Sequence, residues 1–182
     1  MIFLFYFLLL LLVLAGAYFL LGAYRLLVRR EILFVPTSNA MLPALAEGMG
    51  IRPGDAVYDL GCGNGRILIA LAEREKGARY VGIERDIIPY ILFKLKLRGK
   101  KLPIEARRAD FFGENISEAT HVVMYLIPSM MPRVVEKLSR EARPGTRIFS
   151  VDFPLPASWR IRTLPPIETG HYGRKIHLYL AE

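Results

Sequence analysis

The sequence predicts an α/β fold: a mostly parallel sheet with helices on both faces, preceded by one apolar N-terminal helix. Three observations predict this architecture. Residues 1–24 carry no charge, strand-like and helix-like patterns alternate through the rest of the chain, and three closely spaced glycines follow the first strand-like run. In a chain of 182 residues, the part beyond the apolar stretch is long enough for one modest domain.

The N-terminal segment is long enough to cross a membrane. At about 1.5 Å per residue, a helix over residues 1–24 is about 36 Å long, and the hydrocarbon core of a bilayer is about 30 Å thick. The rival interpretation is a cleavable signal peptide, for which Ala15, Gly16 and Ala17 offer small residues. No positive charge precedes the apolar run, however, and the run continues beyond Ala17 to Tyr24. The sequence therefore favours a retained transmembrane anchor.

Basic residues at the exit of this helix predict its orientation. Arg25, Arg29 and Arg30 follow the apolar run, and no basic residue precedes it. The positive-inside rule then predicts a single-pass protein whose main domain lies in the cytoplasm, or on the matrix side if the membrane is mitochondrial. The predicted division of the chain is an anchor, a linker with a short helix, and a main domain, at 1–24, 25–50 and 51–182.

Strands are predicted where apolar and β-branched residues gather between turn signals. The first strand follows a Pro53-Gly54 turn, and the fifth follows Pro144-Gly145. The last two strands are predicted to close the sheet as an antiparallel pair. The predicted strands lie at 57–60, 80–84, 104–108, 121–126, 147–151, 160–164 and 175–181.

Helices are predicted between these strands from apolar residues at helical spacing. One begins directly after the third glycine, and another follows the second strand, with Pro89 in the first turn, where proline is tolerated. The predicted helices span 39–49, 66–76, 87–95 and 129–139. Because strand and helix alternate throughout, the chain is expected to form a Rossmann-like, mostly parallel sheet.

The glycine turn predicts a nucleotide-shaped cofactor. Gly61, Gly63 and Gly65 let the backbone turn sharply and leave no side chain between the turn and a ligand. A dinucleotide turn requires Gly or Ala three residues after Gly63, but Arg66 stands there. The Gly-x-Gly-x-Gly spacing, with Asp59 two residues before it, looks like the S-adenosyl-L-methionine turn of class I methyltransferases.

Acidic residues at the ends of neighbouring strands support that cofactor. Asp59 is expected near its ammonium group, Glu84 at its ribose hydroxyls, and Asp110 at its adenine amino group. Each also has a plainer explanation, since Asp59 and Asp110 are able to cap turns and Glu84 could be a solvated strand end. The faces of the adenine ring are expected to lie against Ile83, Arg85 or Phe111. The predicted cofactor-binding set is Asp59, Gly61, Gly63, Gly65, Glu84, Arg85, Asp110 and Phe111.

Composition limits the alternatives. The single cysteine, Cys62, lies inside the glycine turn, so the chain has no disulfide or zinc framework and no metal site is predicted. The formal net charge of +8 has its densest basic cluster at 94–108. That cluster is explained by a solvated helix face, by an anionic membrane surface or by nucleic acid. With an anchor present, the membrane ranks first and nucleic acid last.

The chain resembles the membrane-anchored protein-lysine methyltransferases that modify the c subunit of ATP synthase and the adenine nucleotide translocase, together with their prokaryotic relatives. The resemblance runs from about residue 34 to about residue 159. It rests on Val-Pro-Thr-Ser at 35–38, the glycine turn with Gly-Arg-Ile at 65–67, Glu84, Asp110-Phe111, Pro-Ser-Met-Met-Pro at 128–132, Glu-Lys-Leu at 136–138, and Phe-Pro-Leu-Pro at 153–156 with Trp159.

The resemblance implies a class I, S-adenosyl-L-methionine-dependent protein-lysine N-methyltransferase that acts on a membrane protein. Tyr125 and Asp152 are then the candidates for the wall of the lysine channel. Asp152 stands where the mitochondrial enzymes carry Arg, so the acceptor need not be shared with them, and Asn64 stands where the family often has Asp. The segment that begins at Tyr125 also lacks the Asn/Asp-Pro-Pro-aromatic motif common in methyltransferases of nucleobase amines.

Two other functions remain open. The first is methylation of a lipid or another membrane-associated small molecule, with the apolar residues of 87–93 as a membrane-docking surface in place of helix–sheet packing. The second is a non-catalytic module that binds S-adenosyl-L-methionine and transfers nothing. The motifs around Pro128 and Phe153 favour the lysine methyltransferase.

Overall fold

The computed structural model describes residues 2–27, 39–169 and 174–182. The chain divides into two compact units, Met1–Val35 and Pro36–Glu182; the second contains the sheet and is called the sheet-containing unit below. Several sequence features lie outside the described residues, namely Arg29, Arg30 and the linker at 31–38 with its Val-Pro-Thr-Ser motif.

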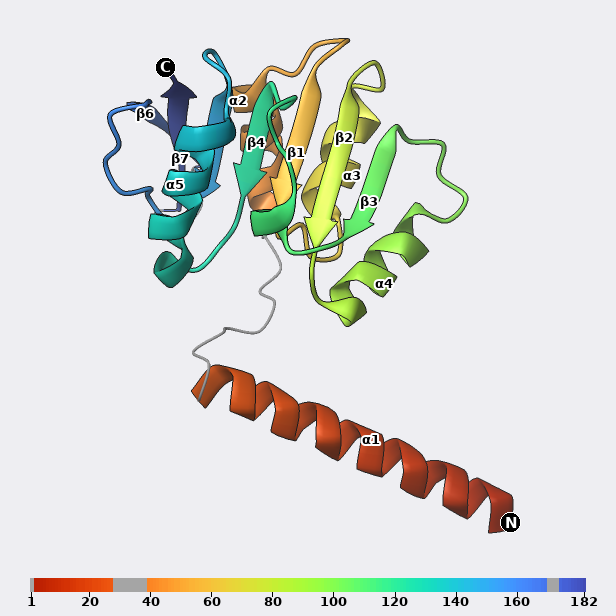
Figure 1. Ribbon diagram of the computed structural model, residues 1–182. Helices are drawn as coiled ribbons and strands as arrows, with labels where there is room; N and C mark the ends of the chain where they lie inside the picture. The colour runs from red at the N-terminus through yellow and green to blue at the C-terminus, as the bar shows by residue number, and fades with distance from the viewer. Residues whose placement is uncertain (1, 28–38, 170–173) are drawn as a thin grey trace. The chain divides into compact units, whose positions relative to one another are not determined.

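The apolar N-terminal segment forms a helix, as predicted. Helix α1 spans Ile2–Leu27 (Figure 1), and Ile2–Gly22 within it is long and apolar enough to cross a membrane. This finding rests on length and composition, and a signal sequence near an N-terminus has the same properties.

The described residues of the second unit form one seven-stranded sheet, with the order β3-β2-β1-β4-β5-β7-β6 (Figure 1). Strands β1 to β5 run parallel, and β7 lies antiparallel between β5 and β6. The predicted α/β class and the antiparallel closing pair are confirmed. The strands are β1 Ala56–Leu60, β2 Arg79–Glu84, β3 Ile104–Arg108, β4 His121–Met124, β5 Arg147–Val151, β6 Ile161–Glu168 and β7 Lys175–Ala181.

The four helices of the sheet-containing unit agree with the prediction to within a few residues. Strand β4 ends two residues earlier than predicted, because its pairing with β1 stops at the Leu60–Met124 partners. The α-helices are α2 Leu42–Met49, α3 Arg66–Arg74, α4 Ile87–Leu97 and α5 Met131–Glu141, with short 3-10 turns η1 Asn39–Met41, η2 Phe111–Gly113 and η3 Pro128–Met130.

Two hydrophobic clusters lie on opposite faces of the sheet. Successive residues of a strand point to opposite faces, so Tyr58 belongs to one cluster and Val57 to the other. Helix α5 covers the first face through Met131, Val134 and Leu138. The second face is covered by α2, by α3 and by the α4 side chain Phe93. Helices therefore lie on both faces, as the sequence predicts.

Helix α2 is fastened to the sheet at its C-terminal end. Arg147 of β5 donates to the carbonyl oxygens of Gly48 and Met49, at 2.9 and 2.6 Å. His121 of β4 bonds to the Met49 carbonyl at 3.1 Å, and burial lowers the pKa of this histidine. The carbonyls of Gly48 and Met49, which have no partner within the helix, are therefore satisfied by a guanidinium and an imidazole from the sheet.

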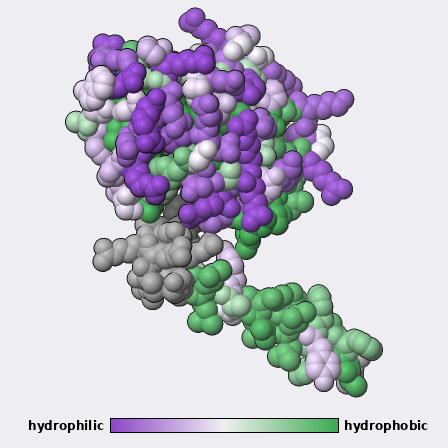
Figure 2. All heavy atoms as spheres, viewed as in Figure 1, coloured by the Kyte–Doolittle hydropathy of each residue, from purple (hydrophilic) through white to green (hydrophobic). Residues whose placement is uncertain are grey.

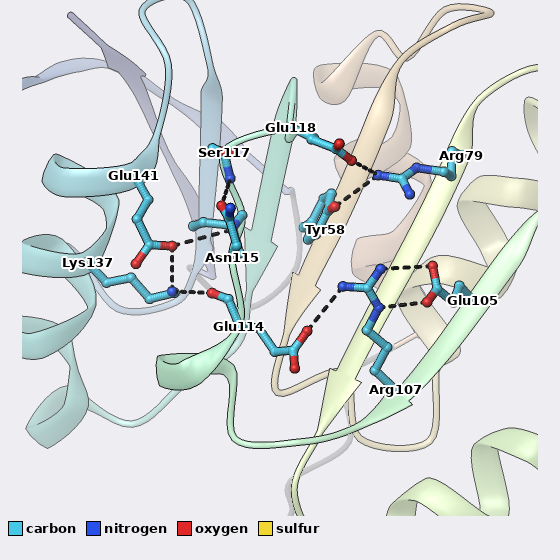
Figure 3. Close-up of polar contacts among 11 residues, drawn as sticks. Tyr58, Arg79, Glu105, Arg107, Glu114, Asn115, Ser117, Glu118, Lys137 and Glu141 are labelled. Carbon is cyan, nitrogen blue, oxygen red and sulfur yellow. Dashed lines mark hydrogen bonds and ion pairs between the residues drawn. The ribbon is translucent and has the colours of Figure 1, made fainter.

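Ion pairs cover part of the first sheet face, over β1 to β3 (Figure 3). Arg107 of β3 pairs with Glu105 at 2.7 Å and with Glu114 at 3.1 Å. Arg79 of β2 pairs with Glu118 at 2.6 Å and donates to the Tyr58 hydroxyl at 2.9 Å. Glu114 and Glu118 belong to the segment between β3 and β4, so these pairs fix that segment on the sheet.

The edge strand β6 carries two prolines. Strand β6 runs to Glu168 although it contains Pro165 and Pro166, and its pairing with β7 shifts register between Leu164 and Ile167. Both prolines are exposed. The shift accommodates them, because proline has no N–H for a ladder.

Candidate active site

The predicted site residues gather at the carboxyl edge of the parallel strands. Asp59 lies in β1, Glu84 ends β2, Asp110 follows β3, Tyr125 follows β4 and Asp152 follows β5. The chain order reverses between β1 and β4, because β2 and β3 lie on one side of β1 while β4 and β5 lie on the other. Ligands of doubly wound sheets bind at this kind of switch point.

The glycine turn between β1 and α3 adopts a backbone that other residues resist. Gly61, Gly63 and Gly65 have φ values of 73°, 56° and 72°. A Cβ on Gly65 would lie 1.8 Å from the Phe93 ring, and one on Gly61 would lie 2.8 Å from Leu126. The turn therefore favours glycine at all three positions for its conformation, and at Gly61 and Gly65 for packing as well.

Asp59 is a buried carboxyl group with an unused oxygen. Its residue is 1% exposed, and Oδ2 has no hydrogen-bond partner among the described residues. Burial first, and the charge of Glu84 second, raise its pKa to about 8. A buried carboxyl with an unused oxygen beside a glycine turn is suited to a cationic ligand group, which would favour its ionised form.

Glu84 ties the second strand to the glycine turn. Its Oε2 accepts from the Gly63 N–H at 2.9 Å, and its Oε1 accepts from the Asp86 N–H at 2.7 Å. Burial raises the pKa of Glu84, and these backbone bonds oppose the rise. Each oxygen of a carboxylate has a second lone pair, so both oxygens keep capacity for a pair of hydroxyl groups.

The residues predicted to hold the adenine differ in their surroundings. Asp110 is exposed, and its Oδ1 accepts from the Phe112 N–H at 3.0 Å, which caps the 3-10 turn η2. Phe111 is 6% exposed and packs against Phe112, with ring centroids 4.3 Å apart. Arg85 is exposed and lies 3.8 Å from Asp86. The structure brings Asp110 and Phe111 to the carboxyl edge, and their contact with adenine stays a prediction.

A buried lysine holds the segment that contains Asp110 and Phe111 (Figure 3). Lys137 of α5 is 1% exposed; its Nζ donates to the Glu114 carbonyl at 2.5 Å and to Glu141 at 2.6 Å. Glu141 also accepts from the Ile116 N–H at 3.3 Å. The segment between β3 and β4 is therefore bonded to α5 on one side and to Arg79 and Arg107 on the other.

Asp152 has a strained backbone and an unused oxygen. Its φ of 64° is the one positive value among the described residues other than glycine. Its Oδ2 lies 3.6 Å from Arg174 Nη1, whereas its buried Oδ1 has no hydrogen-bond partner in the described parts of the chain. The carboxylate is thus held by a cation on one side and is free to accept on the other.

Tyr125 lies beside Asp152. Burial first, and the Asp152 carboxylate second, raise the pKa of Tyr125, so the phenol keeps its proton at neutral pH. Its ring stacks with Phe153, with centroids 6.3 Å apart. Tyr125, Asp152 and Phe153 therefore form one cluster at the ends of β4 and β5, adjacent to the switch point.

Sequence reasoning missed Arg174. The residue precedes β7, in the tail that the family resemblance does not cover, and it also approaches Met41 Sδ at 3.6 Å. The sequence predicts β7 as the antiparallel partner of β6, but not its pairing with β5, so no sequence signal pointed to this residue. The Asp152 N–H donates to the Lys175 carbonyl at 2.9 Å, which brings Arg174 next to Asp152.

The remaining candidate chemistries find little support in the site. Burial raises the pKa of Cys62, with Asp59 and Glu84 adding to the rise, so its thiol is not poised as a nucleophile. Over residues 2–27, 39–169 and 174–182, no group of three or more His, Cys, Asp and Glu side chains is arranged to hold a metal ion.

The residues present fit S-adenosyl-L-methionine. The glycine turn has three residues at positive φ and no side chain between its backbone and a ligand. Asp59 offers an unused buried acceptor for an ammonium group, and Glu84 offers two oxygens for the ribose hydroxyls. These groups lie at the ends of adjacent strands, β1 and β2, as a nucleoside of this size requires.

Known proteins resemble this chain in sequence. Residues 59–162 match the ANTKMT methyltransferase domain. The chain is 32% identical over 149 residues to a protein-lysine N-methyltransferase of Saccharolobus islandicus, and the match covers 81% of this chain and 92% of that protein. It is 29% identical over 127 residues to the human lysine N-methyltransferase of the ATP synthase c-subunit, with 68% of this chain matched. The chain spans about half of that human relative, 52% of its length.

A solved structure is similar in fold and in sequence. It is the crystal structure of an RNA methyltransferase from Salinibacter ruber in complex with S-adenosyl-L-homocysteine. The TM-score is 0.70 at 32% sequence identity, and the match covers 81% of this chain and 95% of that one. Its bound ligand is the demethylated form of S-adenosyl-L-methionine.

Proposed function

Because this chain belongs to the ANTKMT methyltransferase family and is an S-adenosyl-L-methionine-dependent methyltransferase, we propose that it methylates the side-chain amine of a lysine in a membrane protein. The similar proteins of Saccharolobus islandicus and human are named as lysine N-methyltransferases, and the human protein is named for a part of ATP synthase. These names support a lysine acceptor. The acceptor protein of this chain is part of the proposal.

The residues on the cofactor side of the site would bind and orient S-adenosyl-L-methionine. Asp59 would accept from the ammonium group, Glu84 would hold the ribose hydroxyls, and the backbone of the turn at 61–65 would lie against the ligand. Asp110, Phe111 and Arg85 are assigned to the adenine. When bound, S-adenosyl-L-methionine supplies an electrophilic methyl group on a sulfonium. The chain needs no nucleophile of its own, because positioning is the main contribution of such a site.

One observation carries the proposal of an amine acceptor. Asp152 presents Oδ1 as a buried acceptor with no partner in the described residues, beside the Tyr125 phenol and at the same edge as Asp59. Buried acceptors are normally satisfied, so an unused one in a strained residue is a site for a ligand donor. An incoming lysine amine carries the N–H groups that would satisfy it.

The amine must lose its proton before it attacks. The reference pKa of lysine is about 10.4, so a small fraction is neutral at pH 7. Desolvation beside the stacked rings of Tyr125 and Phe153, together with the positive charge of a bound sulfonium, would lower that pKa. Tyr125 keeps its own proton at neutral pH and therefore orients the amine through its oxygen, while water carries the released proton away.

Membrane attachment is the second part of the proposal. We assign residues 1–24 to an anchor, 25–50 to a connection and 51–182 to the catalytic domain, with that domain on the side of the membrane that faces the cytoplasm or the matrix. Helix α1 has the length and composition for such an anchor. An anchor raises the local concentration of the enzyme near lysines at the membrane surface.

The test is transfer of a radiolabelled methyl group from S-adenosyl-L-methionine into a membrane fraction from cells that lack this protein. The native chain is compared with Glu84→Ala, and the products are separated on gels after treatment with protease, ribonuclease or lipid extraction. A discrete protease-sensitive band that depends on Glu84 supports the proposal. Label confined to the lipid phase, or no label despite cofactor binding, contradicts it.

RNA is a second candidate acceptor, because the Salinibacter ruber structure is that of an RNA methyltransferase and this chain has a net charge of +8. Ribonuclease-sensitive label in the same experiment would favour RNA over lysine.

Asp152→Asn separates the two sides of the site, since Asn also tolerates a positive φ. It should lower turnover and leave the affinity for S-adenosyl-L-methionine unchanged; unchanged turnover would remove Asp152 from the acceptor side.

A further inference from the structure

Helix α4 presents a stripe of apolar side chains to solvent. Its members are between 43% and 56% exposed: Ile87, Ile88, Ile91, Leu92 and Leu95. At about 100° per residue, they cover about 140° of the helix, and the buried Phe93 lies on the opposite side. A hydrophobic patch is visible in Figure 2 at the edge of the sheet-containing unit where Figure 1 draws α4. Such a stripe is unusual for a surface helix.

Lysines border this stripe on both sides. Viewed down the helix axis, Lys94 falls just outside the angular position of Ile87 on one border of the stripe, and Lys96 falls just outside that of Leu92 on the other. Both lysines are exposed. Burial lowers the pKa of Lys96, and the positive charge of Arg66 adds to the effect. Apolar residues flanked by cations are typical of helices that lie in the interface of an anionic membrane.

The stripe lies close to the cofactor side of the site. Helix α4 begins at Ile87, directly after Asp86, whose backbone N–H donates to Glu84 at 2.7 Å. Figure 1 shows that the first turn of α4 lies at the carboxyl edge of the strands. A surface that takes up the stripe would therefore border the candidate active site.

We propose that α4 docks on an anionic bilayer, with its stripe inserted among the headgroups and Lys94 and Lys96 against lipid phosphates. The inference extends the proposed function, but it does not depend on the identity of the acceptor. A chain with a candidate span at Ile2–Gly22 would hold this helix close to a bilayer, where weak insertion is sufficient. Docking would bring the carboxyl ends of the parallel strands, where the candidate active site lies, close to the membrane surface.

The charge pattern argues against a second copy of the chain as the occupant. A symmetric dimer places the same patch on both partners, so Lys94 and Lys96 of one copy would approach those of the other. Like charges brought together at an interface are unfavourable. Phosphates of a bilayer surface instead complement the two borders of the stripe.

The experiment uses the full chain in lipid nanodiscs. Ile91→Cys carries an environment-sensitive fluorophore in the stripe, and Glu136→Cys carries it on the exposed face of α5 as the matched control. The native Cys62 is buried, and unsubstituted chain measures any labelling of it. Binding of S-adenosyl-L-methionine by each labelled variant verifies that it is folded. The nanodiscs contain either phosphatidylcholine alone or equal parts phosphatidylcholine and phosphatidylglycerol, with or without lipids that carry a quencher in the acyl chain.

The expected result is a blue shift of the Ile91→Cys label and its quenching by the acyl-chain quencher, stronger with phosphatidylglycerol and absent for Glu136→Cys. Adding Lys94→Gln or Lys96→Gln should weaken docking in the anionic discs by about fivefold for each lysine. A label that remains solvent-like would overturn the proposal. A blue shift without quenching would overturn it too, because protein and not lipid would then cover the stripe.

Discussion

Replacing Asp59 by Asn tests whether one buried carboxyl group makes S-adenosyl-L-methionine binding depend on pH. In the free protein, the pKa of Asp59 is raised to about 8, mainly by burial, so the group holds a proton at neutral pH. The ligand ammonium favours the ionised form, so the pKa in the complex is lower. Binding below pH 8 therefore releases a proton, and the affinity rises with pH.

The size of the effect follows from that pKa. A pKa near 8 makes the affinity about tenfold lower at pH 7, and about a hundredfold lower at pH 6, than the affinity of the ionised protein. The rise should level off near pH 8, where the amino group of the ligand also begins to lose its proton. Asp59→Asn should bind more weakly at pH 8 and lose the rise.

The assay is isothermal titration calorimetry in buffers of different ionisation enthalpy, which counts the proton released. Asp110→Asn is the matched control and should keep the rise, since its carboxyl group is exposed. 5′-Methylthioadenosine lacks the ammonium group, so its affinity should not depend on Asp59 ionisation. A native affinity that is flat between about pH 6 and pH 8, with no proton released, would refute this reasoning.

The same shift predicts how the stability of the free protein changes with pH. The folded pKa of Asp59, about 8, lies above its ordinary value of 3.8. Its contribution to the free energy of unfolding is therefore fully present below about pH 4 and is lost as the pH rises through about 8. In denaturant titrations, Asp59→Asn should be less sensitive to pH over this range than the native chain.

Two further substitutions test the packing around the site by thermal or denaturant unfolding. Gly65→Ala combines a φ of 72° with a Cβ placed 1.8 Å from Phe93 and should lower the free energy of unfolding by about 3 kcal/mol. The control Gly113→Ala meets nothing within 4 Å and should leave stability nearly unchanged. Equal losses for the two variants would contradict the clash with Phe93. Lys137→Met removes a 1%-exposed lysine with two hydrogen bonds and should cost about 2 kcal/mol. Arg140→Gln, in an exposed pair, should cost less than about 0.5 kcal/mol, and a larger loss there than for Lys137 would refute the ranking.

The positions of Gly61, Gly63, Gly65 and Glu84 in the fold could be predicted from sequence because their signals are local. The glycines follow one strand directly, and Glu84 ends the next strand, so strand periodicity places both at the same edge. Whether Asp59 is buried with an unused oxygen depends on the packing of several strands. No pattern in the sequence carries that information.

The partners of Asp152 and the burial of Lys137 could not be predicted from the sequence. Arg174 reaches Asp152 through the pairing of β5 with β7, which is a long-range register. Lys137 has Glu141 four residues later, which on sequence alone resembles an ordinary surface pair. The side chain is nevertheless buried, and its Nζ also donates to the Glu114 carbonyl, a contact between distant parts of the sequence.

Helix α4 shows why an apolar periodicity does not identify the buried face. A Cβ on Gly65 or Gly82 would collide with Phe93, at 1.8 and 2.7 Å, so this one ring fills the space that the glycines leave over the sheet. Leu97, one turn further along the same side of the helix, packs against the same core cluster. The stripe around Ile91 is then left for another contact.

The two edges of the sheet bear on how the protein behaves when many copies are crowded together. An anchored protein is confined to two dimensions, where copies meet far more often than in solution, and an open strand edge could then extend from one sheet into the next. At one edge, Pro165 and Pro166 of β6 withhold two N–H groups and interrupt the register. At the other edge, β3 exposes the charged side chains of Glu105 and Arg108. With the proposed anchor, this domain would be suited to dense packing on a membrane without fusing into continuous sheets.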